Sequence, residues 1–303
     1  MENKKVNDLR RQKIKTWIFY VSLIIIPLTQ FIIFYVAVNF NSILMSIQVN
    51  TLEGIKYGFG NFTSIFTTYW STIQKAIGNS AIAFSVRVLI GMTGGLLFSY
   101  YIFKKMPAHN FFKVMLFLPT IVSSVCMVTV YRLFVERYYP YIMTGNANAF
   151  GLLSEESTKF GAVLAYNVWV GFGTQVLMYL GAMNNVSDGA LEACKIDGAN
   201  SMQEFVHVVF PGIYSTFLVF VTVNIVEFFT HQMALHTFFG FKELANDNQF
   251  TLGYYMYRLV WIAENDGGDI NYPAALGVMC TLVALPFTFG VRFLMKRFGP
   301  SEE

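Results

Sequence analysis

The sequence predicts an all-α membrane protein with six transmembrane helices and both termini in the cytoplasm. Of its 303 residues, 55% are hydrophobic and only 13% are charged, which is too apolar for an ordinary soluble domain. A hydrocarbon core of about 30 Å requires roughly 20 apolar residues per spanning helix. Six segments meet this requirement: Trp17–Val38, Ile77–Phe103, Phe112–Phe134, Phe160–Met183, Ile213–Phe239 and Pro273–Val291.

The positive charges predict the orientation of these spans. Thirteen Lys and Arg residues precede the first span, lie in the links between spans two and three and spans four and five, or follow the last span. The opposite side carries six over much longer loops: Lys56, Lys75, Arg137, Lys159, Lys242 and Arg258. Lys and Arg accumulate on the cytoplasmic side, so both termini should be inside. The first span is too long for a cleaved signal peptide and should persist as a helix.

Glycine and proline positions predict how spans two and three are shaped. Gly91, Gly94 and Gly95 form a small-residue patch in span two, which lets another helix approach closely. The short link at residues 104–110 makes spans two and three antiparallel neighbours. Pro119 predicts a kink in span three.

Residues 186–212, between spans four and five, predict a polar helical hairpin on the cytoplasmic face. The first helix covers Asp188–Ile196, with Ser187 as its N-cap. Gly198 can supply the left-handed residue that ends it. An amphipathic helix resting on the lipid surface is the alternative, but such helices favour Lys and Arg, and this one is acidic.

The second helix of the hairpin is predicted to begin at Ser201. Ser201 and Glu204 have the spacing of a capping box, in which each side chain bonds to the other residue's backbone N–H. The helix should run toward Phe210, and Pro211 should stop it just before span five.

The hairpin resembles the EAA loop of maltose-importer-type permeases, the membrane subunits of binding-protein-dependent ATP-binding cassette (ABC) importers of sugar. The matching positions are Glu192, Ala193, Gly198, Ala199 and Pro211. The chain departs from that pattern where Cys194 replaces a second Ala and Phe210 replaces a Leu, both modest apolar changes. Residues 60–62 and 111–119 also resemble segments at the same places in that family, so the likeness covers residues 55–298.

The resemblance implies the type I ABC importer permease fold and a set of partners. A core domain at 73–298 would follow an N-terminal part at 1–72 and precede a short tail at 299–303. The partners would be a second permease subunit in a heterodimer, two ATPase subunits and an extracytoplasmic solute-binding protein, in the cell membrane of a prokaryote, with no nucleic acid. The residues implied to contact the ATPase are Glu192, Ala193, Asp197, Gly198 and Ala199.

Polar residues inside the predicted spans are candidates for the cargo site, because such residues are costly at bilayer depth. One helical face of span five carries Asn224, Glu227 and His231, with Phe228 beside them, and span four carries Asn167, Gly171 and Thr174. Two polar stripes among aromatic rings suit a hydroxyl-rich ligand such as a sugar, and the resemblance implies that these two helices bind the sugar.

One alternative and one further expectation concern the ionisable residues of the predicted spans. In the structural alternative, Glu227 and His231, at i and i+4, would pair with each other inside the bundle and stabilise helix packing instead of contacting the cargo. Arg87 in span two is expected to pair with a carboxylate or to reach toward an interface, without a role in transport.

The missing motifs restrict the function. No GxxxxGK[ST] loop is present, so ATP with Mg²⁺ would be used by a separate ATPase and no cofactor is expected on this chain. HExxH, GxSxG and zinc-ligand spacings are absent as well, which argues against an enzyme. The predicted function is a permease subunit that imports carbohydrate, expected to be an oligosaccharide. A proton-coupled secondary transporter using Glu227 and His231, and an importer of another polar solute, are the alternatives.

Overall fold

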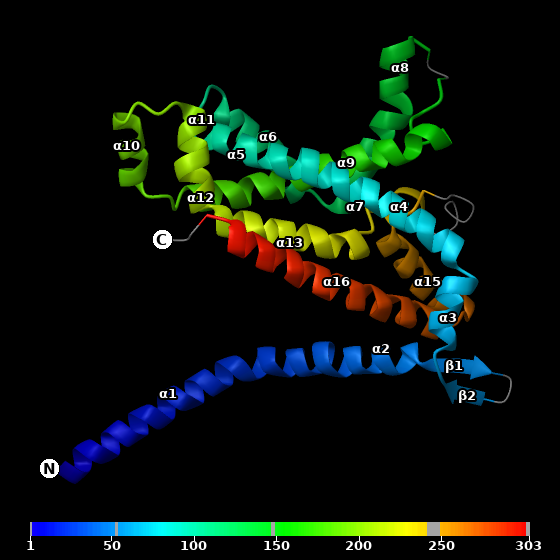
Figure 1. The fold of residues 1–303 in the computed structure, drawn as a ribbon, viewed down its shortest axis with the longest axis horizontal. Coiled ribbons are helices and arrows are strands. Elements are labelled where there is room, and N and C mark those ends of the chain that lie inside the picture. Colours follow the sequence, from blue (N-terminus) through cyan, green and yellow to red (C-terminus); the bar gives the residue numbers. More distant parts are fainter. Residues whose placement is uncertain (1, 52–53, 147–148, 241–248, 301–303) are drawn as a thin grey trace.

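The computed structural model describes residues 2–51, 54–146, 149–240 and 249–300, with side chains from Arg10 onward apart from that of Arg11. Lys242 and the last three residues of the predicted C-terminal tail lie outside this range. Within it, the regular secondary structure is helical except for one antiparallel hairpin of two strands, β1 (Gln48–Thr51) and β2 (Gly54–Tyr57). We call the two ends of the molecule the β-hairpin end and the α10 end (Figure 1).

The first predicted span lies in one long helix beside the bundle. It comprises α1 (Glu2–Gln30), a π-helical stretch at Phe31–Ala37, and α2 (Val38–Ser46). Within this long helix, α2 lies against α16 (Asn271–Phe298), whereas α1 diverges from the other helices toward the α10 end (Figure 1). The start of α1 and the end of α16 both lie at the α10 end.

The second span is continuous and confirms the predicted close approach at its glycines. It follows α3 (Gly60–Thr67) and runs through α4 (Trp70–Val86), a π-helical stretch at Arg87–Met92, and α5 (Thr93–Phe103). A Cβ at Gly94 would lie 2.8 Å from the ring of Phe172, and one at Gly95 would lie 3.2 Å from the side chain of Gln175. Both neighbours belong to α9 (Glu156–Met183), which therefore packs tightly on α5.

The third span is broken, so the prediction of one helix over Phe112–Phe134 is wrong. The segment consists of α6 (His109–Ile121), α7 (Ser124–Leu133), a π-helical stretch at Phe134–Tyr138, and α8 (Tyr139–Thr144). The chain bends by 108° between α6 and α7 because the residues at the break, 122 and 123, have extended ψ angles of 145° and 134°. Pro119, which predicted a kink, lies in the last turn of α6.

The fifth span is shorter than the predicted Ile213–Phe239. After α10 (Asp188–Ile196), α11 (Ser201–Glu204), a π-helical stretch at Phe205–Val209 and α12 (Phe210–Gly212), the chain bends by 72° into α13 (Tyr214–Thr230). The helix ends at Thr230, because His231 has an extended ψ of 121°, and Met233 and Ala234 then adopt left-handed φ angles of 53° and 54°. Then follow α14 (Leu235–Phe239), α15 (Leu252–Asp266) and α16.

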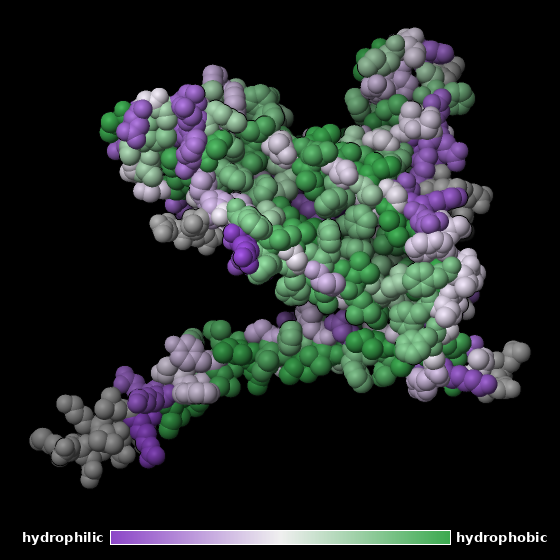
Figure 2. Space-filling model, viewed as in Figure 1, coloured by the Kyte–Doolittle hydropathy of each residue, from purple (hydrophilic) through white to green (hydrophobic). Residues whose placement is uncertain are grey.

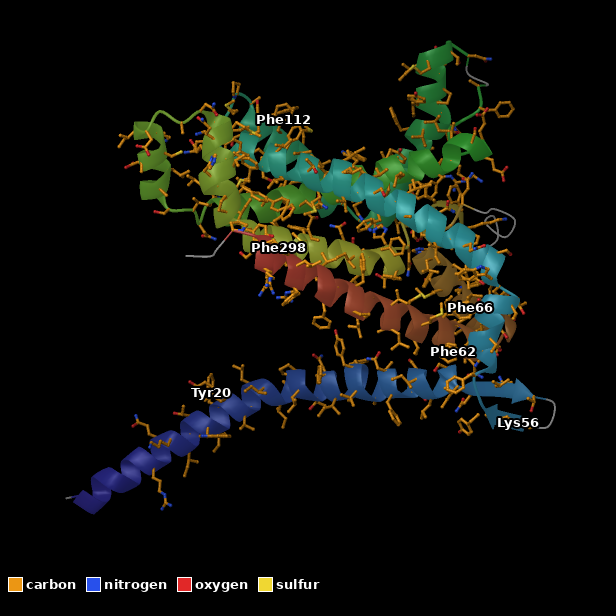
Figure 3. The ribbon with its side chains drawn as sticks, in the orientation of Figure 1. Tyr20, Lys56, Phe62, Phe66, Phe112 and Phe298 are labelled. Atoms are coloured by element: carbon orange, nitrogen blue, oxygen red, sulfur yellow. The ribbon has the colours of Figure 1, made fainter. Side chains whose placement is uncertain are left out.

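The exposed surface is dominated by apolar side chains, with polar ones at both ends (Figure 2). Aromatic side chains occur near both ends as well: Figure 3 places Phe112 and Phe298 toward the α10 end and Phe62 and Phe66 toward the β-hairpin end. Among the described residues, four helices are long and apolar enough to cross a membrane, and six spans result if each bent pair forms one. An apolar surface between two polar ends fits a multi-pass membrane protein.

Candidate functional site

The predicted cytoplasmic hairpin is present, and its first helix projects from the end of the bundle (Figure 1). α10 has no fully buried residue, and Glu192, Ala193 and Asp197 are exposed. Gly198 is exposed with φ 77°, which confirms the predicted left-handed end of the helix, and Ala199 is half-buried. All five residues implied to contact an ATPase therefore lie on one small protruding unit.

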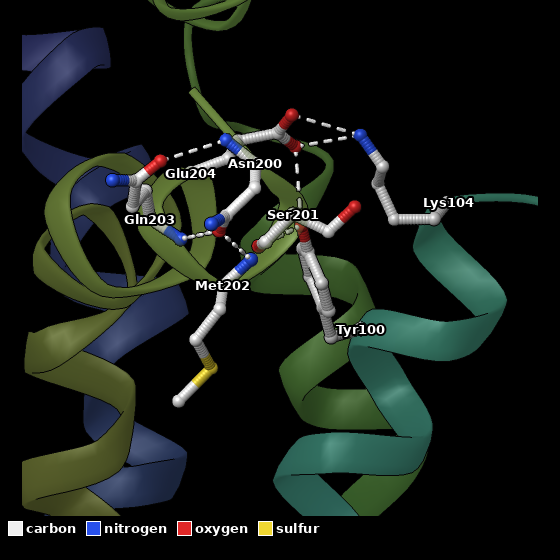
Figure 4. Close-up of polar contacts among 7 residues, drawn as sticks. All are labelled: Tyr100, Lys104, Asn200, Ser201, Met202, Gln203 and Glu204. Carbon is white, nitrogen blue, oxygen red and sulfur yellow. Dashed lines mark hydrogen bonds and ion pairs between the residues drawn. The ribbon is translucent and has the colours of Figure 1, made fainter. Parts of the chain in front are cut away.

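The cap of the second helix differs from the prediction by one residue. Asn200, rather than Ser201, is the N-cap: its Oδ1 accepts hydrogen bonds from the N–H groups of Met202 and Gln203, at 3.0 and 2.9 Å. The Gln203 Oε1 in turn accepts the Asn200 N–H at 2.8 Å, which completes a capping box (Figure 4). Asn is as good an N-cap as Ser, so both registers fit the sequence pattern. At the start of α10, Ser187 occupies the N-cap position without a side-chain capping bond.

Glu204, freed from the capping role, anchors the hairpin to the end of span two. Its carboxylate accepts two hydrogen bonds from Lys104 Nζ, 2.9 Å to Oε1 and 2.8 Å to Oε2. The Tyr100 hydroxyl donates to the Ser201 carbonyl at 2.7 Å and lies 3.3 Å from Glu204 Oε1 (Figure 4). The Glu204 side chain is 5% exposed and that of Lys104 is 24% exposed. A buried, charge-assisted pair of this kind fixes the orientation of the groups that form it.

Apolar packing completes the base of the hairpin. Phe205, Val209 and Ile213 form a buried cluster with residues of spans two and four: Leu96, Tyr179 and Met183. The ring of Tyr100 lies 4.9 Å from that of Phe205, centroid to centroid. The predicted stop at Pro211 is displaced to Gly212, after which the chain turns into α13. α11 and α12 are thus held by the bundle on one side, whereas α10 contributes the half-buried Leu191 to this cluster and no fully buried residue.

In span four, Asn167, Gly171 and Thr174 lie on the predicted stripe of α9. Gly171 and Thr174 are exposed, and Asn167 is half-buried. The Asn167 amide donates to the carbonyl of Val163 at 2.8 Å and to that of Met233 at 3.0 Å. Asn167 therefore ties span four to the segment that follows α13.

In span five, the structure separates His231 from the helical stripe that was predicted. Asn224 is buried within α13, and Glu227 and Phe228 are half-buried, but His231 follows the helix with an extended ψ of 121°. The Thr251 hydroxyl donates to the His231 carbonyl at 2.8 Å, and His231 Nδ1 accepts the Met233 N–H at 3.2 Å. His231 thus belongs to the turn that ends α13.

Glu227 is paired with Arg87, and the predicted alternative of a Glu227–His231 pair is wrong. Arg87 Nη1 lies 2.8 Å from Glu227 Oε2, joining span two to span five. The Arg87 side chain is 14% exposed, whereas that of Glu227 is 37% exposed. Of the two side chains, the Glu227 carboxylate is therefore the more accessible from outside the contact, or junction, between spans two and five. Nothing in the sequence links these two residues beyond the expectation that Arg87 needs a carboxylate.

Several buried polar atoms near this pair have no hydrogen-bond partner among the described residues. They are Arg87 Nε, Gln175 Oε1, Tyr179 OH and Asn224 Oδ1. Spans two, four and five contribute them, and a Cβ at Gly91 would lie 3.8 Å from both the Arg87 side chain and Gln175 Oε1. The ring of Tyr179 lies 4.8 Å from that of Phe220, whose carbonyl accepts the Asn224 amide. Buried polar atoms nearly always have partners, so these four atoms are exceptions within the described part of the chain. Tyr179 was not predicted.

Known proteins resemble this chain in sequence and in fold. Residues 87–302 match the family described as binding-protein-dependent transport system inner membrane component. The chain is 24% identical to the arabinooligosaccharides transport system permease protein AraP of Bacillus subtilis (strain 168), over 84% of this chain and 81% of that protein. It is 27% identical to the probable starch degradation products transport system permease protein AmyD of Thermoanaerobacterium thermosulfurigenes, over 69% of this chain and 71% of that protein.

The structural likeness extends over almost the whole chain. A chain from the crystal structure of a bacterial ABC transporter involved in the import of the acidic polysaccharide alginate matches with a TM-score of 0.76 at 16% sequence identity. The match covers 96% of this chain and 99% of that chain. At this identity the likeness concerns the fold alone.

The fold is that of a chain from a bacterial ABC transporter. The chain belongs to the family of binding-protein-dependent transport system inner membrane components. The predicted resemblance to sugar-importer permeases is confirmed, and the chain is a multi-pass protein of the bacterial plasma membrane.

Proposed function

We propose that this chain is one transmembrane subunit of an ATP-driven importer that carries carbohydrate, and that it forms half of the translocation path. The observation that carries the proposal is the hairpin: an exposed acidic helix, α10, on a base fixed to the bundle by Glu204 and Lys104. A helix that transmits a push must be accessible to its partner and must not yield at its base. Glu192 supplies a carboxylate to a partner cleft, and Ala193 and Ala199 keep the unit thin.

The same proposal assigns the topology. The α10 end would face the cytoplasm, with both termini inside. The bent α6–α7 segment and α13 would each form one span, so that the chain crosses the membrane six times. The core domain would be residues 73–298. Two ATPase subunits, a second permease subunit and an extracytoplasmic solute-binding protein would complete the importer. The positive charge at the α10 end supports this orientation.

The proposed cargo is a neutral oligosaccharide. The proposed contacts lie on spans four and five: Asn167, Gly171, Thr174, Asn224, Glu227, Phe228 and His231. Support comes from the unpartnered polar atoms at the junction, from the exposed Trp169 beside the α9 stripe, and from the sugar permeases among the relatives. Because Arg87 neutralises Glu227, the junction carries no net charge from this pair, which suits an uncharged guest.

Reconstitution separates this function from proton-coupled transport. Proteoliposomes that contain this chain, its second permease, the ATPase and the loaded binding protein should accumulate sugar when ATP is enclosed, even with a protonophore present. A non-hydrolysable ATP analogue is the matched control and should give no accumulation. Uptake by the purified chain alone, driven by a pH step, would refute the proposal in favour of the proton-coupled alternative.

A further inference from the structure

A groove follows the interface of α13 and α16 from the α10 end into the bundle. Its outer part is a hollow of about 570 Å³ lined by the first half of α13 and by Arg292, Lys296 and Pro300. A second hollow of about 430 Å³ continues between the same two helices, reaching Met256 of α15. Arg292 lines both hollows, which places a cation where they meet.

The outer hollow combines positive charge with hydroxyl groups. Arg292 and Lys296 are one helical turn apart on α16, so both head groups lie on the same face of the helix. Neither forms an ion pair or hydrogen bond with any residue in the described ranges. Ser215 and Thr222 of α13 line the opposite wall. Two unneutralised cations with hydroxyls across from them favour an anionic group that accepts several hydrogen bonds.

The inner hollow is apolar and follows one face of α16. Its α16 wall begins at Gly277 and includes Ala284, small residues that leave room beside the helix, and Phe229 and Met256 contribute to the other walls. The stretch from Gly277 to Arg292 is about 22 Å long at 1.5 Å per residue. Half of a bilayer core is roughly 15 Å, so an acyl chain of one leaflet fits within this length.

We propose that this groove binds an anionic phospholipid of the cytoplasmic leaflet. The phosphate lies between Arg292 and Lys296, the hydroxyls of Ser215 and Thr222 contact the rest of the head group, and one acyl chain occupies the inner hollow. A soluble phosphate would use the cations but leave the apolar continuation without a purpose. Basic pockets between helices on the cytoplasmic side are suited to anionic head groups. The inference rests on the proposed orientation of the α10 end, but not on the cargo.

Lipid retention by the purified importer complex tests this assignment. The complex is equilibrated with mixed micelles of phosphatidylglycerol and phosphatidylcholine, and bound lipids are counted by native mass spectrometry. Wild type should retain phosphatidylglycerol in preference to phosphatidylcholine. The double variant Arg292→Gln with Lys296→Gln should retain it on the order of 30-fold more weakly, since each cation near the surface contributes to the attraction.

Arg297 offers a matched control, because it is exposed at the same end of α16 but does not line the groove. Arg297→Gln should leave phosphatidylglycerol retention unchanged. Ala284→Phe, which fills the inner hollow and keeps both cations, should weaken retention of long-chain phosphatidylglycerol but not of a short-chain analogue. Melting temperatures confirm that each variant is folded.

Three outcomes would overturn the assignment. They are equal retention by wild type and the Arg292/Lys296 double variant, displacement of the lipid by millimolar inorganic phosphate, and binding by the isolated chain that disappears on assembly with the second permease. The last would make the groove a subunit interface. ATP-driven uptake in phosphatidylcholine vesicles tests the proposed function separately, so a failure of one does not imply a failure of the other.

Discussion

Lys104 holds both carboxylate oxygens of Glu204, at 2.9 and 2.8 Å, and so joins the end of span two to the base of the hairpin. Tyr100, one turn earlier on α5, reaches the Ser201 carbonyl of the same base. The hairpin is therefore attached to span two by side-chain bonds as well as to span five by the chain itself. A displacement of the hairpin must move both helices together.

Removing one partner of this pair should loosen the hairpin. Glu204→Gln or Lys104→Met should lower the stability of the complex by about 3 kcal/mol, because each leaves a largely buried charge unpaired. Thermal unfolding of the purified complex measures this. The swapped variant Lys104→Glu with Glu204→Lys should recover part of the loss. If the single variants unfold at the wild-type temperature, the pair does not hold the hairpin.

Changes on α10 itself should affect coupling rather than stability. Glu192→Ala alters an exposed side chain and should change the free energy of unfolding by less than about 0.5 kcal/mol, yet ATP hydrolysis stimulated by the loaded binding protein should collapse. Gly198→Pro should likewise uncouple ATP hydrolysis from sugar uptake, since proline cannot adopt the φ of 77° found at this position. Stimulated ATP hydrolysis and sugar uptake are both measured in proteoliposomes. Wild-type coupling in both variants would argue against contact between α10 and the ATPase.

Two glycines of α9 should respond oppositely to the same substitution. A Cβ at Gly173 would lie 2.0 Å from the Leu116 carbonyl oxygen, whereas one at Gly171 would have nothing within 4 Å. Gly173→Ala should therefore separate α6 from α9 and cost about 3 kcal/mol or more, while Gly171→Ala should fold normally. The melting temperatures and purification yields of the two variants test this prediction. Equal behaviour would contradict the packing of α6 on α9.

The Arg87–Glu227 pair allows cargo binding to be separated from helix packing. Glu227→Gln should raise the sugar concentration for half-maximal uptake by roughly five- to 150-fold, the range for losing a hydrogen-bond partner worth about 1–3 kcal/mol. It should also lower stability, because Arg87 is then buried without its partner. Asn224→Ala should raise the same concentration. Uptake against sugar concentration is the measurement.

The double variant Arg87→Gln with Glu227→Gln is the control for this experiment. It removes both charges, so it should recover much of the melting temperature lost in the single variants. If Glu227 contacts the cargo, the half-saturating concentration should stay high in the double variant. Recovery of both quantities together would mean that the pair holds spans two and five and that the sugar binds elsewhere.

The sequence predicted the parts of this fold that depend on local pattern. Apolar length located the spans, Gly198 marked the left-handed end of α10, and Gly94 and Gly95 marked the contact with α9. It did not predict where helices break. Apolar residues resume within a few positions after Val122 and after Thr230, so hydropathy alone did not mark a helix end, and the break at each place depends on backbone angles that packing selects.

The candidate site shows the same division. Residue spacing located the α9 stripe, and it placed Asn224 and Glu227 on one helix. Pairings between distant segments could not be read from spacing: Arg87 with Glu227 and Lys104 with Glu204 join residues more than 90 positions apart. Near the cap, Asn200 and Ser201 are both good N-caps, so the register of α11 was ambiguous until the chain was folded.

α10 contributes no fully buried residue to the bundle, whereas the segment behind it supplies Phe205 and Val209 to a core cluster. Selection on the exposed face of α10 is therefore largely separate from selection for folding. If α10 contacts the ATPase as proposed, substitutions there would alter which ATPase is recognised while the membrane part keeps its structure. Grafting residues 188–196 from one permease of the family onto another should redirect partner choice, so an importer could evolve to share an ATPase with a second importer by changing a single short helix.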